Sequence, residues 1–139
     1  MITGKPEWWD SAVVFLLKDE VLGPVVEKYD SEHLTGKGDI FATFVRSVVG
    51  QQISVSAAQA VWNRFEKKIK IVNPQKVKDI HHMKLKSCGL SRQKITYLKS
   101  LSNAFLKKTI QPKKWSMLES EIIIEELIQI KGIGKWTAE

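Results

Sequence analysis

A chain of 139 residues has the length of one domain. Its composition, with 43% hydrophobic and 27% charged residues, excludes a disordered tail and a fibrous protein, and no apolar run approaches the ~20 residues that cross a bilayer. One cysteine, Cys88, cannot form an internal disulfide or by itself hold zinc or an iron–sulfur cluster, and the N-terminus lacks a leader pattern. We therefore expect a soluble, cytoplasmic protein with no membrane partner.

Positive charge is concentrated in the middle of the chain. The net charge is +7, and residues 64–114 carry 15 Lys and Arg but only two acidic residues. A segment this basic attracts a phosphate backbone, which favours nucleic acid as the partner. A solvated, lysine-rich helical surface is the alternative at this point.

The first predicted helix runs from Trp8 to about Val21 and ends before Gly23–Pro24. Trp8 and Trp9 are expected to anchor this helix to the core. Apolar residues continue at helical spacing through most of the chain, and no segment shows sustained alternation with a period of two. The sequence therefore predicts an all-α fold.

Four further helices are predicted on apolar stripes at spacings of three and four residues. They cover Phe41–Val49, Ala58–Ile69, Ile95–Leu106 and Ile123–Ile128. Ser54 or Ser56 is the expected N-cap of the second of these helices, and Ser91 opens the third. Outside the helices' apolar faces, His81 and His82 are expected at the surface, while Cys88 is expected to be a small buried residue.

A Gly-x-Gly turn between two helices lies close to the end of the sequence. Gly132 and Gly134 are expected to be glycine because a side chain would block the approach of a phosphate, which amides of the following helix would bind. An ordinary helix–helix turn with a glycine C-cap is the alternative. The helix after the turn has about one turn of sequence, so we expect the chain to be truncated within its domain.

Three segments together resemble one family. The segment ELIQIKGIGKWTAE resembles the helix-hairpin-helix of the HhH-GPD DNA glycosylase superfamily, in the form of 3-methyladenine DNA glycosylase II. FATFVRSVVGQQISVSAAQAVWNRF is similar to the family's helix–loop–helix with a Gly-Gln-Gln-x-Ser signature, and CGLSRQKITYLKSLSNAF resembles its Gly-Leu-Ser-x-x-Lys helix. The resemblance implies a helical bundle of this glycosylase type that occupies residues 1–139 as a partial domain, incomplete at the C-terminus.

The resemblance also implies roles for particular residues. Three would offer backbone amides to a DNA phosphate: Gly132, Gly134 and Thr137. The Gln52 side chain would enter the duplex as the target nucleotide leaves, with Gln51 and Ser54 supporting its loop. For the two glutamines, a solvated or capping pair at a helix junction is the alternative.

The hairpin is also where the family holds a monovalent cation, Na⁺ or K⁺. The resemblance implies that the backbone carbonyls of Ile128, Ile130 and Ile133 would point at it. We expect that no cofactor is required for activity, the cation being an addition that the resemblance implies.

Trp136 stands where strand-cleaving members of the superfamily carry a lysine that forms a Schiff base with the sugar. A tryptophan there suits stacking on an electron-poor alkylated base, with core packing as the alternative. The family's catalytic aspartate would follow the hairpin by about twenty residues, beyond Glu139. The resemblance therefore implies no catalytic residue within these 139 residues, which we expect to be inactive.

The resulting hypothesis is a monofunctional, monomeric N-glycosylase of base excision repair, which flips and hydrolytically removes alkylated purines from double-stranded DNA. A non-enzymatic helix-hairpin-helix DNA-binding module is the rival hypothesis, since charge and hairpin support both. The Gln51–Ser54 loop and Trp136 favour the enzyme, because a simple backbone clamp needs neither. A helical protein-interaction domain would leave the Gly-x-Gly turn unexplained.

Overall fold

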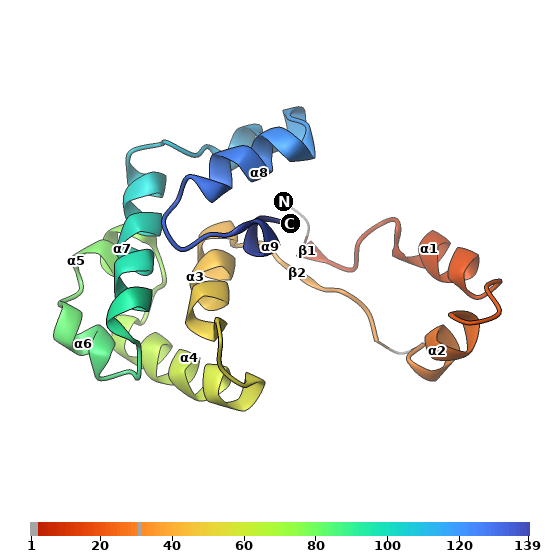
Figure 1. Cartoon of the computed structure of the whole chain (residues 1–139), viewed down its shortest axis with the longest axis horizontal. Coiled ribbons are helices and arrows are strands. Elements are labelled where there is room, and N and C mark those ends of the chain that lie inside the picture. The colour runs from red at the N-terminus through yellow and green to blue at the C-terminus, as the bar shows by residue number, and fades with distance from the viewer. Residues whose placement is uncertain (1–2, 31) are drawn as a thin grey trace. The chain divides into compact units, whose positions relative to one another are not determined.

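The computed structural model describes residues 3–30 and 32–139, and most of its regular structure is helical, as predicted (Figure 1). The chain forms two compact units, residues 1–39 and residues 40–139. The strand pairing in the described residues is a single two-residue ladder, so the all-α prediction is confirmed.

The first unit holds two short helices between the strands of this ladder. Strand β1 (Thr3–Gly4) pairs antiparallel with β2 (Gly36–Lys37). Helices α1 (Trp9–Leu16) and α2 (Gly23–Lys28) lie between them along the chain. Two-residue strands carry no alternation of polar and apolar residues, which is why the sequence gives no sign of them.

The predicted first helix is wrong at its C-terminal end, because α1 stops at Leu16 rather than near Val21. The Asp19 carboxylate accepts hydrogen bonds from the amides of Val21 and Leu22, at 2.9 and 2.8 Å, and so favours a turn over a continued helix. Gly23–Pro24 opens α2 instead of ending α1, since proline lacks an N–H and fits the first turn of a helix.

The expectation that Trp8 and Trp9 anchor the first helix to the core is also wrong. Trp8 is 54% exposed, and its ring lies 5.8 Å from that of Trp9. Neither ring belongs to the cluster of buried side chains, which among the described residues lies wholly within 40–139. Helices of eight and six residues offer too little apolar surface to enclose two indole rings.

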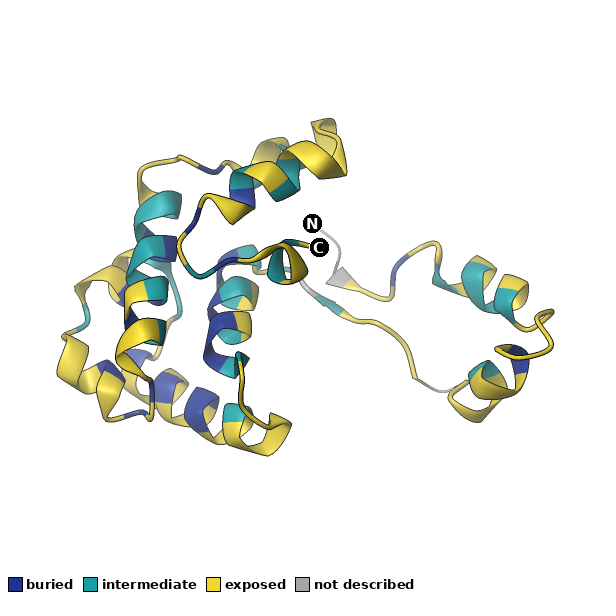
Figure 2. Cartoon of the chain, in the orientation of Figure 1, coloured by how far each residue is buried: buried dark blue, intermediate teal, exposed yellow. Residues whose placement is uncertain are grey.

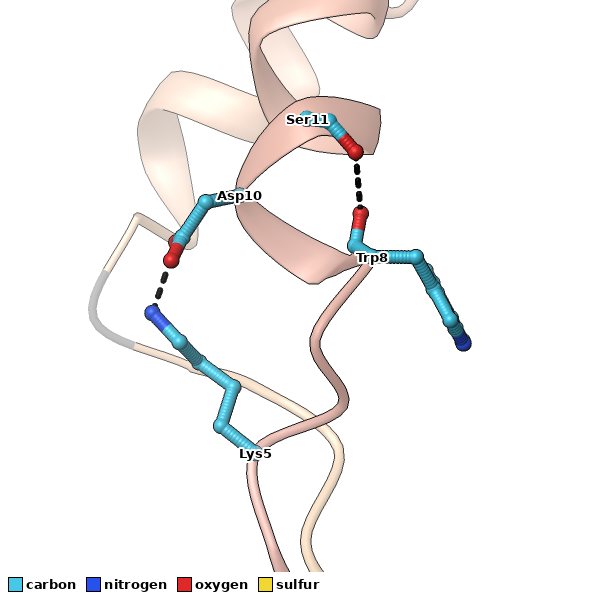
Figure 3. Close-up of polar contacts among 4 residues, drawn as sticks. All are labelled: Lys5, Trp8, Asp10 and Ser11. Atoms are coloured by element: carbon cyan, nitrogen blue, oxygen red, sulfur yellow. Dashed lines mark hydrogen bonds and ion pairs between the residues drawn. The ribbon is translucent and has the colours of Figure 1, made fainter.

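The start of α1 is held instead by polar contacts. Lys5 Nζ lies 2.6 Å from Asp10 Oδ1, and the Ser11 hydroxyl donates to the Trp8 carbonyl over 2.8 Å (Figure 3). Both contacts are exposed, so each contributes modestly to stability.

The second unit contains the rest of the helices. In chain order they are α3 (Ile40–Gly50), α4 (Val55–Ile69), α5 (Pro74–Asp79), α6 (His82–Lys86), α7 (Arg92–Leu106), the 3-10 helix η1 (Pro112–Met117), α8 (Ser120–Ile128) and α9 (Lys135–Ala138). The four predicted stripes correspond to α3, α4, α7 and α8, whereas α5, α6 and η1 are too short to give a periodic signal. As predicted, Ser54 caps α4 and Ser91 caps α7, through the amides of Ala57 and Lys94.

The core of this unit lies where α3, α4, α5 and α7 face one another, as the dark blue segments of Figure 2 show. Val48 of α3, Phe65 of α4, Val77 of α5 and Leu98 of α7 are fully buried. The ammonium of Lys99 on α7 donates to the Val77 and Ile80 carbonyls, at 2.9 and 2.6 Å. This lysine therefore ties the C-terminal end of α5 to α7, at the negative pole of the shorter helix.

Cys88 is fully buried, as expected, and its burial raises the pKa of its thiol above the ordinary value. At pH 8 the native thiol is therefore more fully protonated than an unfolded one, and it is also shielded from reagents. Modification by a thiol reagent at pH 8 should be far slower in the native protein than in a urea-unfolded control, with a rate that rises as urea is added. A native rate equal to the unfolded rate would contradict this burial.

Candidate nucleic-acid interface

Three segments that are far apart in the sequence enclose one cavity in the second unit. They are the loop between α3 and α4, the N-terminal end of α7, and the hairpin between α8 and α9. The cavity has a volume of about 750 Å³. Seven of the site residues expected from the sequence line it: Gln51, Gln52, Gly132, Ile133, Gly134, Trp136 and Thr137. Ser54 is not among the lining residues and acts as the cap of α4.

Gly132 must be glycine for a reason internal to the protein. Its φ is +96°, and a Cβ atom there would lie 2.1 Å from Cγ of Tyr97. The turn of the hairpin thus packs directly on the Tyr97 ring of α7. The sequence predicts a glycine here only from the approach of a phosphate, because nothing in the sequence pairs residue 132 with residue 97.

Gly134 differs from Gly132, because a Cβ atom there would point into open space. Gly134 is the N-cap of α9, and its carbonyl accepts from the amides of Thr137 and Ala138 over 3.0 and 3.1 Å. The Thr137 amide, expected to bind a phosphate, is therefore already used within the helix. Only the Thr137 side chain is left for such a contact.

The loop after α3 is tied to the hairpin by one side chain. Gln51 Nε2 donates to the carbonyl oxygen of Gly132 over 2.9 Å, across 81 positions of sequence. Its neighbour Gln52 is exposed and has a φ of +57°, a left-handed conformation that costs a non-glycine residue roughly 1–2 kcal/mol. The structure therefore separates the two glutamines: Gln51 joins two segments, and Gln52 is exposed at a strained turn.

Trp136 is 92% exposed, so the alternative in which it packs in the core is wrong. It lines the cavity from α9. The adjacent Lys135 lies 3.7 Å from the Glu139 carboxylate, in an exposed ion pair along the same short helix. An indole ring is thus available at the cavity for stacking against a planar ligand.

Lys94 brings a cation to the cavity from the first turn of α7. Its ammonium donates to the Val49 carbonyl over 2.7 Å, and burial lowers the pKa of Lys94. None of the described residues that line the cavity is Asp or Glu. This residue is the Lys of the Gly-Leu-Ser-x-x-Lys segment, and the sequence alone indicates no role for it.

A second, smaller depression of about 390 Å³ lies on α7 beside the hairpin. Arg92 and Lys131 line it, together with Gln93, Thr96 and Tyr97. Apart from the basic character of residues 64–114, nothing in the sequence pointed to this pairing of cations from two segments.

No group of three or more His, Cys, Asp or Glu side chains in the part of the chain that the structure describes is placed to hold a metal ion. His81 and His82 are exposed, as expected, and His81 Nδ1 accepts from the Met83 amide as the cap of α6. Among the helices described, none is long and apolar enough to span a membrane.

The amino-acid sequence is similar to a known protein family and to characterised proteins. The model of the HhH-GPD superfamily of base excision DNA repair proteins matches residues 45–136, so the chain belongs to this superfamily. DNA-3-methyladenine glycosylase 1 of Schizosaccharomyces pombe is 34% identical over 119 residues, which are 83% of this chain and 52% of that protein. The chain therefore spans about half the length of this curated relative.

Two solved structures support the same assignment. A 3-methyladenine DNA glycosylase of S. pombe in complex with abasic DNA superposes with a TM-score of 0.79 at 31% identity, over 92% of this chain and 66% of that one. A DNA-3-methyladenine glycosidase from Bacillus halodurans gives a TM-score of 0.75 at 28% identity, over 93% and 61%.

The two hairpin glycines should respond differently to alanine. Gly132→Ala forces a strained φ and a clash with Tyr97, so it should lower the free energy of unfolding by roughly 1–3 kcal/mol. Gly134→Ala adds a methyl group in open space, so the change should stay within about 0.5 kcal/mol. Urea unfolding of both variants measures the difference. Equal losses would mean that the hairpin does not pack on Tyr97.

Proposed function

We propose that the protein is a DNA N-glycosylase of base excision repair, which extrudes alkylated purines of the 3-methyladenine type from double-stranded DNA and hydrolyses their N-glycosyl bond. The observation that carries this proposal is the hydrogen bond from Gln51 to Gly132, because it joins the loop between α3 and α4 to the hairpin around one cavity. A clamp and a projecting side chain held in fixed register suit an enzyme that must grip a duplex and fill the gap left by a base. The protein acts as a monomer.

The hairpin is the clamp of this proposal. Gly132 and Gly134 lie at the turn that begins α9, where backbone amides suit a phosphate oxygen, and Thr137 contributes its hydroxyl group. Arg92 and Lys131 add positive charge beside the hairpin. These contacts address the DNA backbone, so binding depends little on base sequence.

Gln52 and Trp136 have separate roles in base extrusion: one fills the gap in the duplex and the other contacts the extruded base. Gln52 is exposed at the tip of the loop and fills the space that the base leaves, which offsets part of the cost of unstacking. Trp136, exposed at the cavity, stacks on the electron-poor ring of an alkylated purine. The names of the relatives, which are 3-methyladenine glycosylases, support this class of substrate.

Hydrolysis requires a carboxylate to stabilise the sugar cation and assist water. The described residues that line the cavity include no Asp or Glu, so the carboxylate of this proposal is the aspartate that the family resemblance implies about twenty residues after the hairpin. Position 136 is Trp rather than Lys, so a Schiff base with the sugar is not formed there and the DNA strand is left intact.

A monovalent cation, Na⁺ or K⁺, is part of the proposal, and no other cofactor is required. The carbonyls of Ile128, Ile130 and Ile133 would hold it. The Ile130 carbonyl accepts one hydrogen bond, from the Ile133 amide over 2.9 Å, and its second lone pair is compatible with a cation. Bound there, the cation supplies positive charge that supports the hairpin's phosphate contact.

Binding to DNA should be mainly electrostatic. The affinity of the 139-residue chain for undamaged duplex should fall steeply between ~50 and ~200 mM salt, because each neutralised phosphate contributes about 0.9 to the slope of log K against log salt. Fluorescence anisotropy over a salt series measures this slope. An affinity that does not change with salt would contradict the proposed interface.

The 139 residues alone should bind DNA without releasing a base, because the cavity lining offers no carboxylate. A longer chain that includes the family's aspartate should release methylated purines from alkylated duplex and leave an unbroken strand until hot alkali is added. Release of free base, followed by strand analysis with and without alkali, tests both parts. Nicking before alkali would contradict the role of Trp136, and binding without release by the longer chain would instead favour a non-enzymatic DNA-binding module.

A further inference from the structure

Lys94 lies in the N-terminal turn of α7, where an unpaired positive charge is energetically unfavourable. It is the third residue of α7, and a lysine in the first turn of a helix meets the positive end of the helix dipole. Burial lowers its pKa, and no carboxylate among the described residues forms an ion pair with it. A lysine at such a position needs a compensating partner.

That partner is the C-terminal end of α3. The Lys94 ammonium donates to the carbonyl of Val49, the penultimate residue of α3, over 2.7 Å. Carbonyls in the last turn of a helix have no partner within it, and a cation there is favourable. One side chain therefore links the start of α7 to the end of α3.

The chain changes direction immediately after that carbonyl. Gln51 still donates its amide to the Val48 carbonyl over 3.4 Å, and Gln52 then turns into its left-handed conformation. A strained residue persists only where its surroundings hold it. The groups that hold this turn are Lys94 on the α3 side and, on the hairpin side, the bond from Gln51 to Gly132.

We propose that Lys94 is a positioning residue for the Gln51–Gln52 loop: its ammonium fixes the end of α3 and thereby sets the direction in which Gln52 projects. The part of this inference that concerns DNA rests on the proposed function. Lys94 does not touch the extruded base and does not bind a phosphate. It determines how well the loop distinguishes a duplex with a missing base from an intact one.

The first experiment needs no DNA. Lys94→Met removes the cation and its donors, and Lys67→Met removes the same charge from an exposed position on α4 as a matched control. Hydrogen exchange at the Gln51 amide should be at least about tenfold faster in Lys94→Met and unchanged in Lys67→Met. The Ala58 amide, bonded to the Ser54 carbonyl over 2.8 Å, serves as an internal reference. Equal exchange at Gln51 in the two variants would overturn the proposal.

The second experiment separates positioning from phosphate binding. Affinities of the 139-residue chain are measured for an undamaged duplex and for one containing a stable abasic-site analogue, over a salt series. Lys94→Met should lose most of the preference for the abasic duplex, as Gln52→Ala should, with a salt slope equal to that of Lys67→Met. A slope lower by about one than in the control, with the preference retained, would make Lys94 a phosphate contact and overturn the proposal.

Further Lys94 variants and the binding preference of the unmodified chain separate a failure of this proposal from a failure of the proposed function. Lys94→Arg retains a cation and should restore most of the abasic preference; if Lys94→Met does not fold, Lys94→Gln is measured in its place. If the unmodified chain has no preference for the abasic duplex, the proposed role of Gln52 fails. The exchange experiment still decides whether Lys94 positions the loop.

Discussion

Gly132 is the residue at which the separate parts of the site meet. Its backbone rests on the Tyr97 ring, so closely that a Cβ atom would lie 2.1 Å from Cγ, and its carbonyl accepts the side chain of Gln51. One glycine thus sets the hairpin against α7 and, through Gln51, against the loop after α3. The geometry of the cavity depends on this close approach, because each wall comes from a different one of the three segments.

The charged groups around the site are predominantly basic. Basic residues reach it from α7 and from the start of the hairpin, and the lining residues that the structure describes include no carboxylate. The ammonium groups of Lys94 and Lys99 donate hydrogen bonds to carbonyls at the C-terminal ends of helices. Arg92 and Lys131, in contrast, are exposed. The basic segment therefore serves two purposes: some of its cations hold helices in place, and others face an anionic partner.

The long helices and their caps could be read from the sequence because both signals are local. Apolar spacing predicted α3, α4, α7 and α8. Ser54 and Ser91 are N-caps of α4 and α7, a position that serine commonly occupies. The first helix ends earlier than its apolar spacing predicts, because the Asp19 carboxylate accepts hydrogen bonds from the amides of Val21 and Leu22. The core role given to Trp8 and Trp9 failed because hydrophobicity indicates a tendency to be buried but not whether enough neighbouring surface exists.

By itself the sequence determined the helical class, the family and part of the set of residues that line the cavity, since these follow from periodic patterns and short motifs. Tertiary structure alone decided what those residues do for one another. It placed Gly132 on Tyr97, exposed Trp136 and directed Lys94 to Val49. The physical reason is that these relations join positions tens of residues apart or depend on the solvent exposure of the assembled surface, and neither is encoded in the spacing of residues along a helix.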